Sequence, residues 1–219
     1  MSVISGIIPA TRQSGRFAIL VDGEIVATLS LDAIERLRLA VGREVGELVE
    51  RIVAEDAQLK VYDRALNMLA FRARSSVELS RALVRKGEEK EQVERVIERL
   101  TEQGLLNDAA FAESFTRSKV LGARKSRRRV QQELARKGVS REVSDAAVNV
   151  VFEEEGVDQR AMVEEAARRK MHTLAKLDPA VRRRRLYAFL ARRGYDGEDI
   201  RRAMKVAGAE LQESEAAEE

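Results

Sequence analysis

The sequence predicts a mainly α-helical protein, made of tandem three-helix modules in an elongated, curved body, with a small N-terminal extension that holds a β-hairpin and short helices. Composition is the first reason: 35% of the residues are charged, 4% are aromatic and none is Trp, a mix typical of helical assemblies. The second reason is that the chain has only two prolines, Pro9 and Pro179, so long helices can form. The third is a helical pattern that repeats three times.

A β-hairpin is the first expected element. The apolar runs at 17–21 and 25–29 flank Asp22-Gly23, and Asp-Gly between such runs is a strong hairpin signal because glycine accepts positive φ. Residues 1–15 contain two glycines and a proline, which favour a loose segment.

A short helix is expected after the hairpin. Ser30 has the side chain of a helix N-cap, and the apolar spacing that follows it predicts a helix over 31–39, which Gly42 ends. Beyond residue 46 nearly the whole chain has helical periodicity.

Three helix-turn-helix corners share the pattern Leu-x-x-(Lys/Arg)-Gly. Apolar residues four apart make one helix face, and the base and glycine suit a left-handed helix end. The glycines stand at 87, 138 and 194, spacings of 51 and 56 residues, so each repeat has room for a third helix. We expect these leading helices over 61–71, 108–120 and 159–175. The predicted domains are an extension (1–58), three modules (59–107, 108–157 and 158–207) and an acidic disordered tail (208–219).

The modules differ in the charge at the start of their second helix. In the first, Ser75 to Glu78 form a capping box, which places an acid where the helix dipole favours it. The second begins with bases from Arg124 to Arg129, and in the third Asp178 and Pro179 are followed by Arg182 to Arg185. A base in this position costs about 0.3–1 kcal/mol when it is exposed. A polyphosphate partner would explain the pattern, because phosphate is attracted both to the helix N-terminus and to arginine. The candidate nucleic-acid- and filament-binding residues are Arg124, Lys125, Arg127, Arg128, Arg129, Lys137, Arg182, Arg183, Arg184 and Arg185.

The overall charge distribution also favours a polyanion. Residues 117–205 hold 24 Lys/Arg against 13 Asp/Glu, whereas residues 206–219 hold five Glu and no base. Two other interpretations stay open: a solvated helix face that keeps the protein soluble, and an acidic surface on a protein partner.

Several classes of site have no support in the sequence. The chain has no Cys and a single histidine, His172, for which we expect a structural or surface role. Gly-rich phosphate loops and nucleophile elbows are absent, so no enzymatic activity, cofactor or metal is expected. The apolar runs are too short to span a membrane, and we expect a cytoplasmic protein. Six aromatic residues fall at apolar helical positions and are expected in the core, namely Tyr62, Phe71, Phe111, Phe115, Tyr187 and Phe189; Tyr195 is expected to be exposed.

Over roughly residues 60–205 the chain resembles the RecX family of regulatory proteins. Each fragment that carries the resemblance is degenerate, and their order and spacing make the match specific. The family's second module usually has a second acid where Ala109 stands, and often a glycine near Ser126. In chain order, the fragments are Ala65 to Ser75, Glu78-Leu79, Leu83 to Gly87, Gly104 to Asp108, Phe111-Ala112 and Leu134-x-x-Lys137-Gly138.

This resemblance implies a non-catalytic regulator, usually an inhibitor, of the RecA recombinase in DNA repair, homologous recombination and the SOS response. Such a protein lies in the groove of a RecA filament on single-stranded DNA and changes ATP hydrolysis and strand exchange. The implied partners are the RecA filament, single-stranded DNA and, as a second candidate, double-stranded DNA. We expect a monomer that does not bind membranes.

Two rival functions are compatible with the same residues. A helix-turn-helix DNA-binding transcriptional regulator would prefer one duplex sequence and would usually form a symmetric dimer. A scaffold whose arginines meet carboxylates on another protein would have no affinity for naked nucleic acid.

Overall fold

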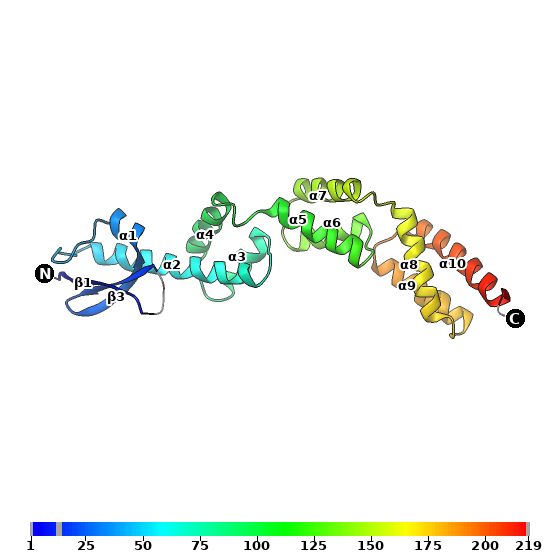
Figure 1. The fold of residues 1–219 in the computed structure, drawn as a ribbon, viewed down its shortest axis with the longest axis horizontal. Coiled ribbons are helices and arrows are strands. Elements are labelled where there is room, and N and C mark those ends of the chain that lie inside the picture. The colour runs from blue at the N-terminus through cyan, green and yellow to red at the C-terminus, as the bar shows by residue number, and fades with distance from the viewer. Residues whose placement is uncertain (1, 12–14, 218–219) are drawn as a thin grey trace. The chain divides into compact units, whose positions relative to one another are not determined.

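The computed structural model describes residues 2–11 and 15–217, and it divides into two compact units. The first unit holds Met1–Ala73 and Leu79–Leu105, and the second holds Arg74–Glu78 and Leu106–Glu219. The structure is mostly helical, with one small sheet near the N-terminus (Figure 1). The predicted fold class is therefore confirmed in being mainly α-helical with a small β-containing N-terminal extension.

The sheet of the first unit has three antiparallel strands in the order β1-β2-β3. The predicted hairpin is confirmed as β2 (Arg16–Val21) and β3 (Glu24–Ser30), joined through Gly23 at φ +90°. The expectation of a loose N-terminal segment is wrong for β1 (Ile4–Pro9), which pairs along β2. The strand is stabilised by Ile4, which is fully buried in the core of this unit. The glycines and the proline in this segment favour turns, so the local sequence does not predict the burial of Ile4. The predicted loose segment also includes residues 12–14, which lie outside the described residues.

Two helices complete the core beneath the sheet. Helix α1 (Leu31–Arg36) begins at Ser30, whose hydroxyl accepts the Ala33 N–H at 3.3 Å, as predicted. It ends before Gly42, because the chain turns at Arg38 with φ +52°. Helix α2 (Leu48–Phe71) then runs for 24 residues and packs on β3. The domain boundary predicted at 58/59 therefore falls inside one continuous helix.

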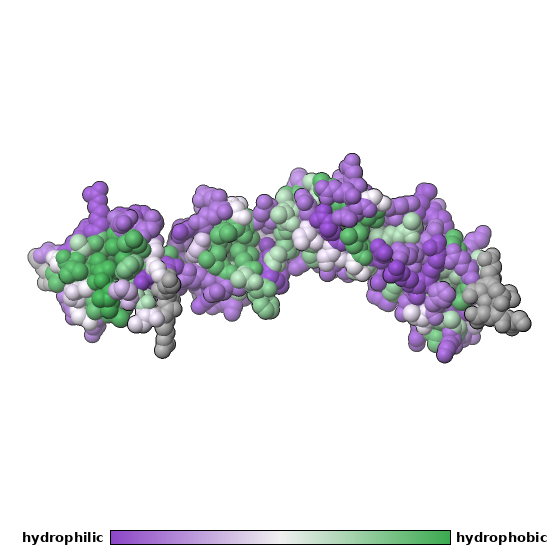
Figure 2. All heavy atoms as spheres, viewed as in Figure 1, coloured by the Kyte–Doolittle hydropathy of each residue, from purple (hydrophilic) through white to green (hydrophobic). Residues whose placement is uncertain are grey.

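The first module consists of the end of α2 with α3 (Ser76–Val84) and α4 (Lys90–Glu102). Figure 2 shows apolar side chains gathered on the viewed face of the sheet region, at the N-terminal end of this unit.

The second unit contains two modules with a shared core. The first of them has α5 (Asp108–Arg117), a π-helical turn η1 (Ser118–Gly122), α6 (Arg127–Arg136) and α7 (Arg141–Glu154). The other has α8 (Gln159–Leu174), α9 (Pro179–Arg192) and α10 (Gly197–Ala217). Their buried residues form one apolar cluster, so the predicted repeat of three-helix modules is confirmed. Among the described residues no helix is long and apolar enough to cross a bilayer.

The prediction of a disordered tail is wrong over 208–217. Helix α10 continues to Ala217 because Leu211 is buried in the core and Glu210 forms an ion pair with Arg168 at 2.8 Å. Residues 218–219 of the predicted tail lie outside the described part of the chain.

Three aromatic residues differ in burial from the prediction made from the sequence. Phe71 is 85% exposed and Tyr187 is 44% exposed, although both were expected in the core. Phe71 is the last residue of α2, so no further helical turn covers it. Tyr195, expected on the surface, is buried, and its hydroxyl donates to the Arg124 carbonyl at 2.8 Å.

Candidate polyanion-binding site

The bases before and along α6 are mostly held by partners within the second unit. Glu133, whose side chain is 14% exposed, accepts from Lys125 Nζ at 2.7 Å and from Arg129 Nε at 2.9 Å. Burial opposes ionisation of Glu133, but the hydrogen bonds and charges of these two bases outweigh it and lower the pKa of the carboxyl. Both bases therefore stabilise the module.

The neighbouring bases are held in similar ways. Arg124 pairs with Glu165 at 3.1 Å, and Lys137 lies 3.2 Å from a Glu78 oxygen. Arg127 donates to Asn149 at 2.7 Å, and its guanidinium lies 4.1 Å from the centre of the Phe152 ring. Arg128 is exposed, and within the described part of the chain it has no ion-pair partner.

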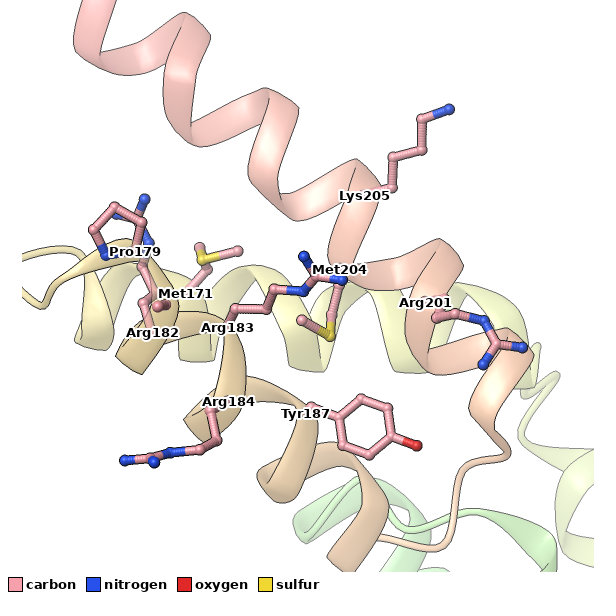
Figure 3. A pocket seen from close by; sticks show the side chains of 10 residues that line it. Met171, Pro179, Arg182, Arg183, Arg184, Tyr187, Arg201, Met204 and Lys205 are labelled. Carbon is pink, nitrogen blue, oxygen red and sulfur yellow. The ribbon is translucent and has the colours of Figure 1, made fainter.

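Three bases of α9, Arg182, Arg183 and Arg184, line a cavity between α8, α9 and α10. The cavity has a volume of about 930 Å³, and its apolar surface includes Met171 and Met204. Arg182 donates to the Ala175 carbonyl at 3.2 Å, which holds its side chain near the end of α8. Figure 3 shows Arg183 extending toward Met204, while Arg184 points away from it. The lining residues are Met171, Pro179, Ala180, Arg182, Arg183, Arg184, Tyr187, Arg201, Met204 and Lys205.

Two of the basic residues in this lining, Arg201 and Lys205 on α10, are absent from the sequence-based set. The sequence does contain a pattern from which Arg201 and Lys205 could have been predicted. The corner at Gly194 folds α10 back along α9, so bases at similar distances before and after the glycine come close together. Arg185, by contrast, is exposed but does not line the cavity.

The cavity differs from the α6 region in its charge balance. Among the side chains that the structure describes, which end at residue 212, none of its five bases forms an ion pair with a carboxylate. Hydrophilic side chains also cover most of the viewed face of the third module (Figure 2). An anion that binds here would meet several cations at once and would replace none of the ion pairs between described side chains.

No group of three or more His, Cys, Asp or Glu side chains that could hold a metal occurs among the residues described. His172 is exposed, and Glu154 and Glu155 form ion pairs with Arg117 at 2.7 and 2.6 Å. Two of the three consecutive glutamates at 153–155 therefore take part in surface ion pairs.

The fold and the cavity bases define the class of protein: a tandem array of three-helix modules with a basic cavity in the third. Three family models match in chain order, namely the first (residues 62–100), second (107–148) and third (158–204) three-helix domains of RecX. The chain belongs to the RecX family of regulatory proteins.

Similar proteins support this assignment. The regulatory protein RecX of Chlorobaculum tepidum is 34% identical over 69% of this chain and 91% of its own length. That of Halalkalibacterium halodurans is 35% identical over 73% of this chain, and the match spans 62% of the relative's length. A crystal structure of a regulatory protein RecX has the same fold, with a TM-score of 0.73 at 24% identity, covering 94% of this chain and 99% of the other.

Proposed function

We propose that this chain is a non-catalytic, cytoplasmic regulator of the RecA recombinase that binds the RecA filament on single-stranded DNA and modulates ATP hydrolysis and strand exchange. Family membership supports the regulatory role, because its similar proteins are named as regulatory proteins. The observation that carries the choice of an anionic partner is the basic cavity of the third module.

Charge balance decides which bases we assign to the partner. Releasing Lys125 or Arg129 to a phosphate would leave the partly buried Glu133 without that cation, which costs free energy. Binding of a phosphate to the cavity bases would leave no described carboxylate without its cation. We therefore assign the main contact to Arg182, Arg183, Arg184, Arg201 and Lys205, with exposed Arg128 as an additional contact.

The direct test is RecA-dependent ATP turnover on single-stranded DNA, measured over a wide ratio of regulator to RecA. We expect turnover to slow as the regulator is added. Unchanged turnover at every ratio would contradict the proposal.

Binding measurements separate the rival functions. A helix-turn-helix transcriptional regulator would prefer one duplex sequence whether RecA is present or not. A scaffold for acidic proteins would bind the filament without responding to the nucleic acid. The proposed regulator prefers the assembled filament to a random duplex of equal length.

A further inference from the structure

The corner motif Lys/Arg-Gly makes a similar set of contacts twice in the second unit, each time with the serine that caps another helix. At Lys137-Gly138, the Ser75 hydroxyl donates to the Lys137 carbonyl and accepts the Glu78 N–H at 3.1 Å. Ser75 is fully buried. One side chain therefore both caps α3 and holds the corner between α6 and α7.

The second occurrence involves Arg193-Gly194. The Ser126 hydroxyl donates to the Gly194 carbonyl at 2.7 Å and accepts the Arg129 N–H at 3.3 Å. In addition, the Ser126 N–H donates to the Arg193 carbonyl at 3.0 Å. Here the capped helix is α6, and the corner is the one between α9 and α10.

A second hydrogen bond accompanies each corner. The residue after the capping serine donates its N–H to the side chain that begins the next module's leading helix. In the first case Ser76 donates to Asp108 at 2.7 Å, and in the second Arg127 donates to Gln159 at 3.2 Å. The two acceptors have different side chains, so the position rather than the residue type is repeated.

Gly138 and Gly194 also lie very close to the first turn of the helix that each corner contacts. A Cβ on Gly138 would lie 2.3 Å from Val77 Cβ, and one on Gly194 would lie 2.6 Å from Arg129 Cβ. Gly87, in the first module's corner, has a similar positive φ, yet a Cβ there would meet no described atom within 4 Å. Positive φ alone therefore explains Gly87, whereas Gly138 and Gly194 are also required by packing.

The start of α9 lacks two features that both contacts use. Asp178 caps α9 by accepting the Ala180 N–H at 2.9 Å, but an ionised carboxylate has no proton to donate to a corner carbonyl. Pro179 has no N–H for the second hydrogen bond. Asp178 and Pro179 therefore supply the cap of α9 without the hydroxyl donor and the N–H that Ser75-Ser76 and Ser126-Arg127 supply at the two corners.

We infer that the corners at Lys137-Gly138 and Arg193-Gly194 are docking joints, and that each holds the serine-capped N-terminus of a helix, α3 for the first and α6 for the second. Ser75, Ser126, Gly138 and Gly194 are the positioning residues of the two joints. The joint is independent of the partner proposed above. It gives the repeated motif a role in the register between modules in addition to its role in the turn.

Glycine-to-alanine variants at the three corners give a matched test. All three glycines have φ between +80° and +90°, so the backbone strain of Ala is shared, and only Gly138→Ala and Gly194→Ala add a clash. The measurement is amide hydrogen exchange by NMR in the full chain at Glu78, Ser76, Ser126 and Arg127. We expect Gly138→Ala to speed exchange at Glu78 and Ser76 by roughly tenfold or more, and Gly194→Ala to do so at Ser126 and Arg127.

Gly87→Ala should leave all four amides close to wild type. Adding Val77→Gly to Gly138→Ala removes the clashing Cβ and should restore slow exchange at Glu78. If Gly87→Ala accelerated these amides as much as the other two variants, or if all three left them unchanged, the joint would be refuted.

A serine variant keeps the test decisive if a glycine variant fails to fold. Ser126→Asp retains the helix-capping acceptor but loses the donor, like Asp178. Its control is Ser140→Asp at the start of α7, where the serine accepts the Val143 N–H at 3.3 Å and lies outside both joints. Faster exchange at Arg127 in Ser126→Asp alone supports the joint, and equal exchange in both variants overturns it.

Discussion

Glu133 forms ion pairs with two nearby bases that the sequence suggests as contacts for a polyanion. Lys125 and Arg129 belong to a basic run that suggests a polyanion site, yet both are directed to the same acid. The run is visible in the sequence, but its neutralisation is not, because Glu133 lies eight residues from Lys125 and meets it only once the helix has formed.

Replacing Glu133 with Gln should destabilise the protein at neutral pH by about 1 kcal/mol, because two partly buried bases lose their shared partner. The pKa of Glu133 is lowered in the folded state, so its contribution is present above about pH 4.5, the ordinary value, and is lost as pH falls through the lower folded value. Urea unfolding between pH 3 and 7 should thus show a smaller loss of stability on acidification in the variant.

The control for this prediction is Glu94→Gln, which affects an exposed pair with Lys90 at 3.5 Å. Its stability should change by less than about 0.5 kcal/mol. Equal acid sensitivity of wild type and Glu133→Gln would contradict the role given to Glu133.

Tyr195 is a second residue whose environment could not be predicted from its position along the chain. Its place after a turn glycine suggests exposure, but the ring is buried and its hydroxyl reaches the Arg124 carbonyl. Burial raises the pKa of this phenol. Only the folding of the corner onto the segment before α6 brings the two residues together.

Tyr195→Phe removes one hydrogen bond and leaves the Arg124 carbonyl without that donor. We expect a loss of about 1 kcal/mol in unfolding free energy, measured by urea denaturation. Tyr187→Phe, at an exposed ring, should change it by less than about 0.5 kcal/mol. A larger loss for the exposed tyrosine would be inconsistent with this assignment.

At the scale of elements, local signals predict helices and corners well. The N-cap at Ser30, the hairpin at Asp22-Gly23 and the repeated corner glycines all depend on residues that are close in sequence. Strand β1 and the end of α10 depend on distant partners. A glutamate-rich segment suggests disorder by composition, but helix formation there is supported by Leu211 in the core and by the ion pair between Glu210 and Arg168.

Leu211→Ala tests this end of α10. The side chain is buried, so we expect a loss of about 2–3 kcal/mol in unfolding free energy and weaker helical circular dichroism. Gln212→Ala, at the exposed neighbour, is the control and should have almost no effect. If the two variants were equally stable, α10 would not be held at this position.

At the scale of the whole molecule, the repeat predicts the modules. It does not predict in which module the basic side chains lack a described carboxylate partner. The sequence marks two arginine runs as equivalent, whereas the structure gives the first run internal partners and places most of the second around a cavity. The elongated, curved form of the whole chain stays a prediction, which small-angle X-ray scattering checks.

The salt dependence of filament binding should report the number of cavity bases in contact with phosphate. Each contact to single-stranded DNA adds about 0.7 to the slope of log affinity against log salt. Reversing three cavity bases should therefore lower the slope by roughly 2. An unchanged slope with lower affinity would mean that the variants act through the fold.

The most direct test of the cavity's role is RecA-dependent ATP turnover on single-stranded DNA with a triple variant, Arg183→Glu, Arg184→Glu and Arg201→Glu. Its control has the same change in charge at exposed bases away from the cavity: Arg141→Glu, Arg160→Glu and Arg192→Glu. We predict that the control slows turnover like the wild-type protein and that the cavity variant, equally well folded, requires at least tenfold more protein for the same effect. If the cavity variant were as effective as wild type, the basic cavity would not be the filament-binding site.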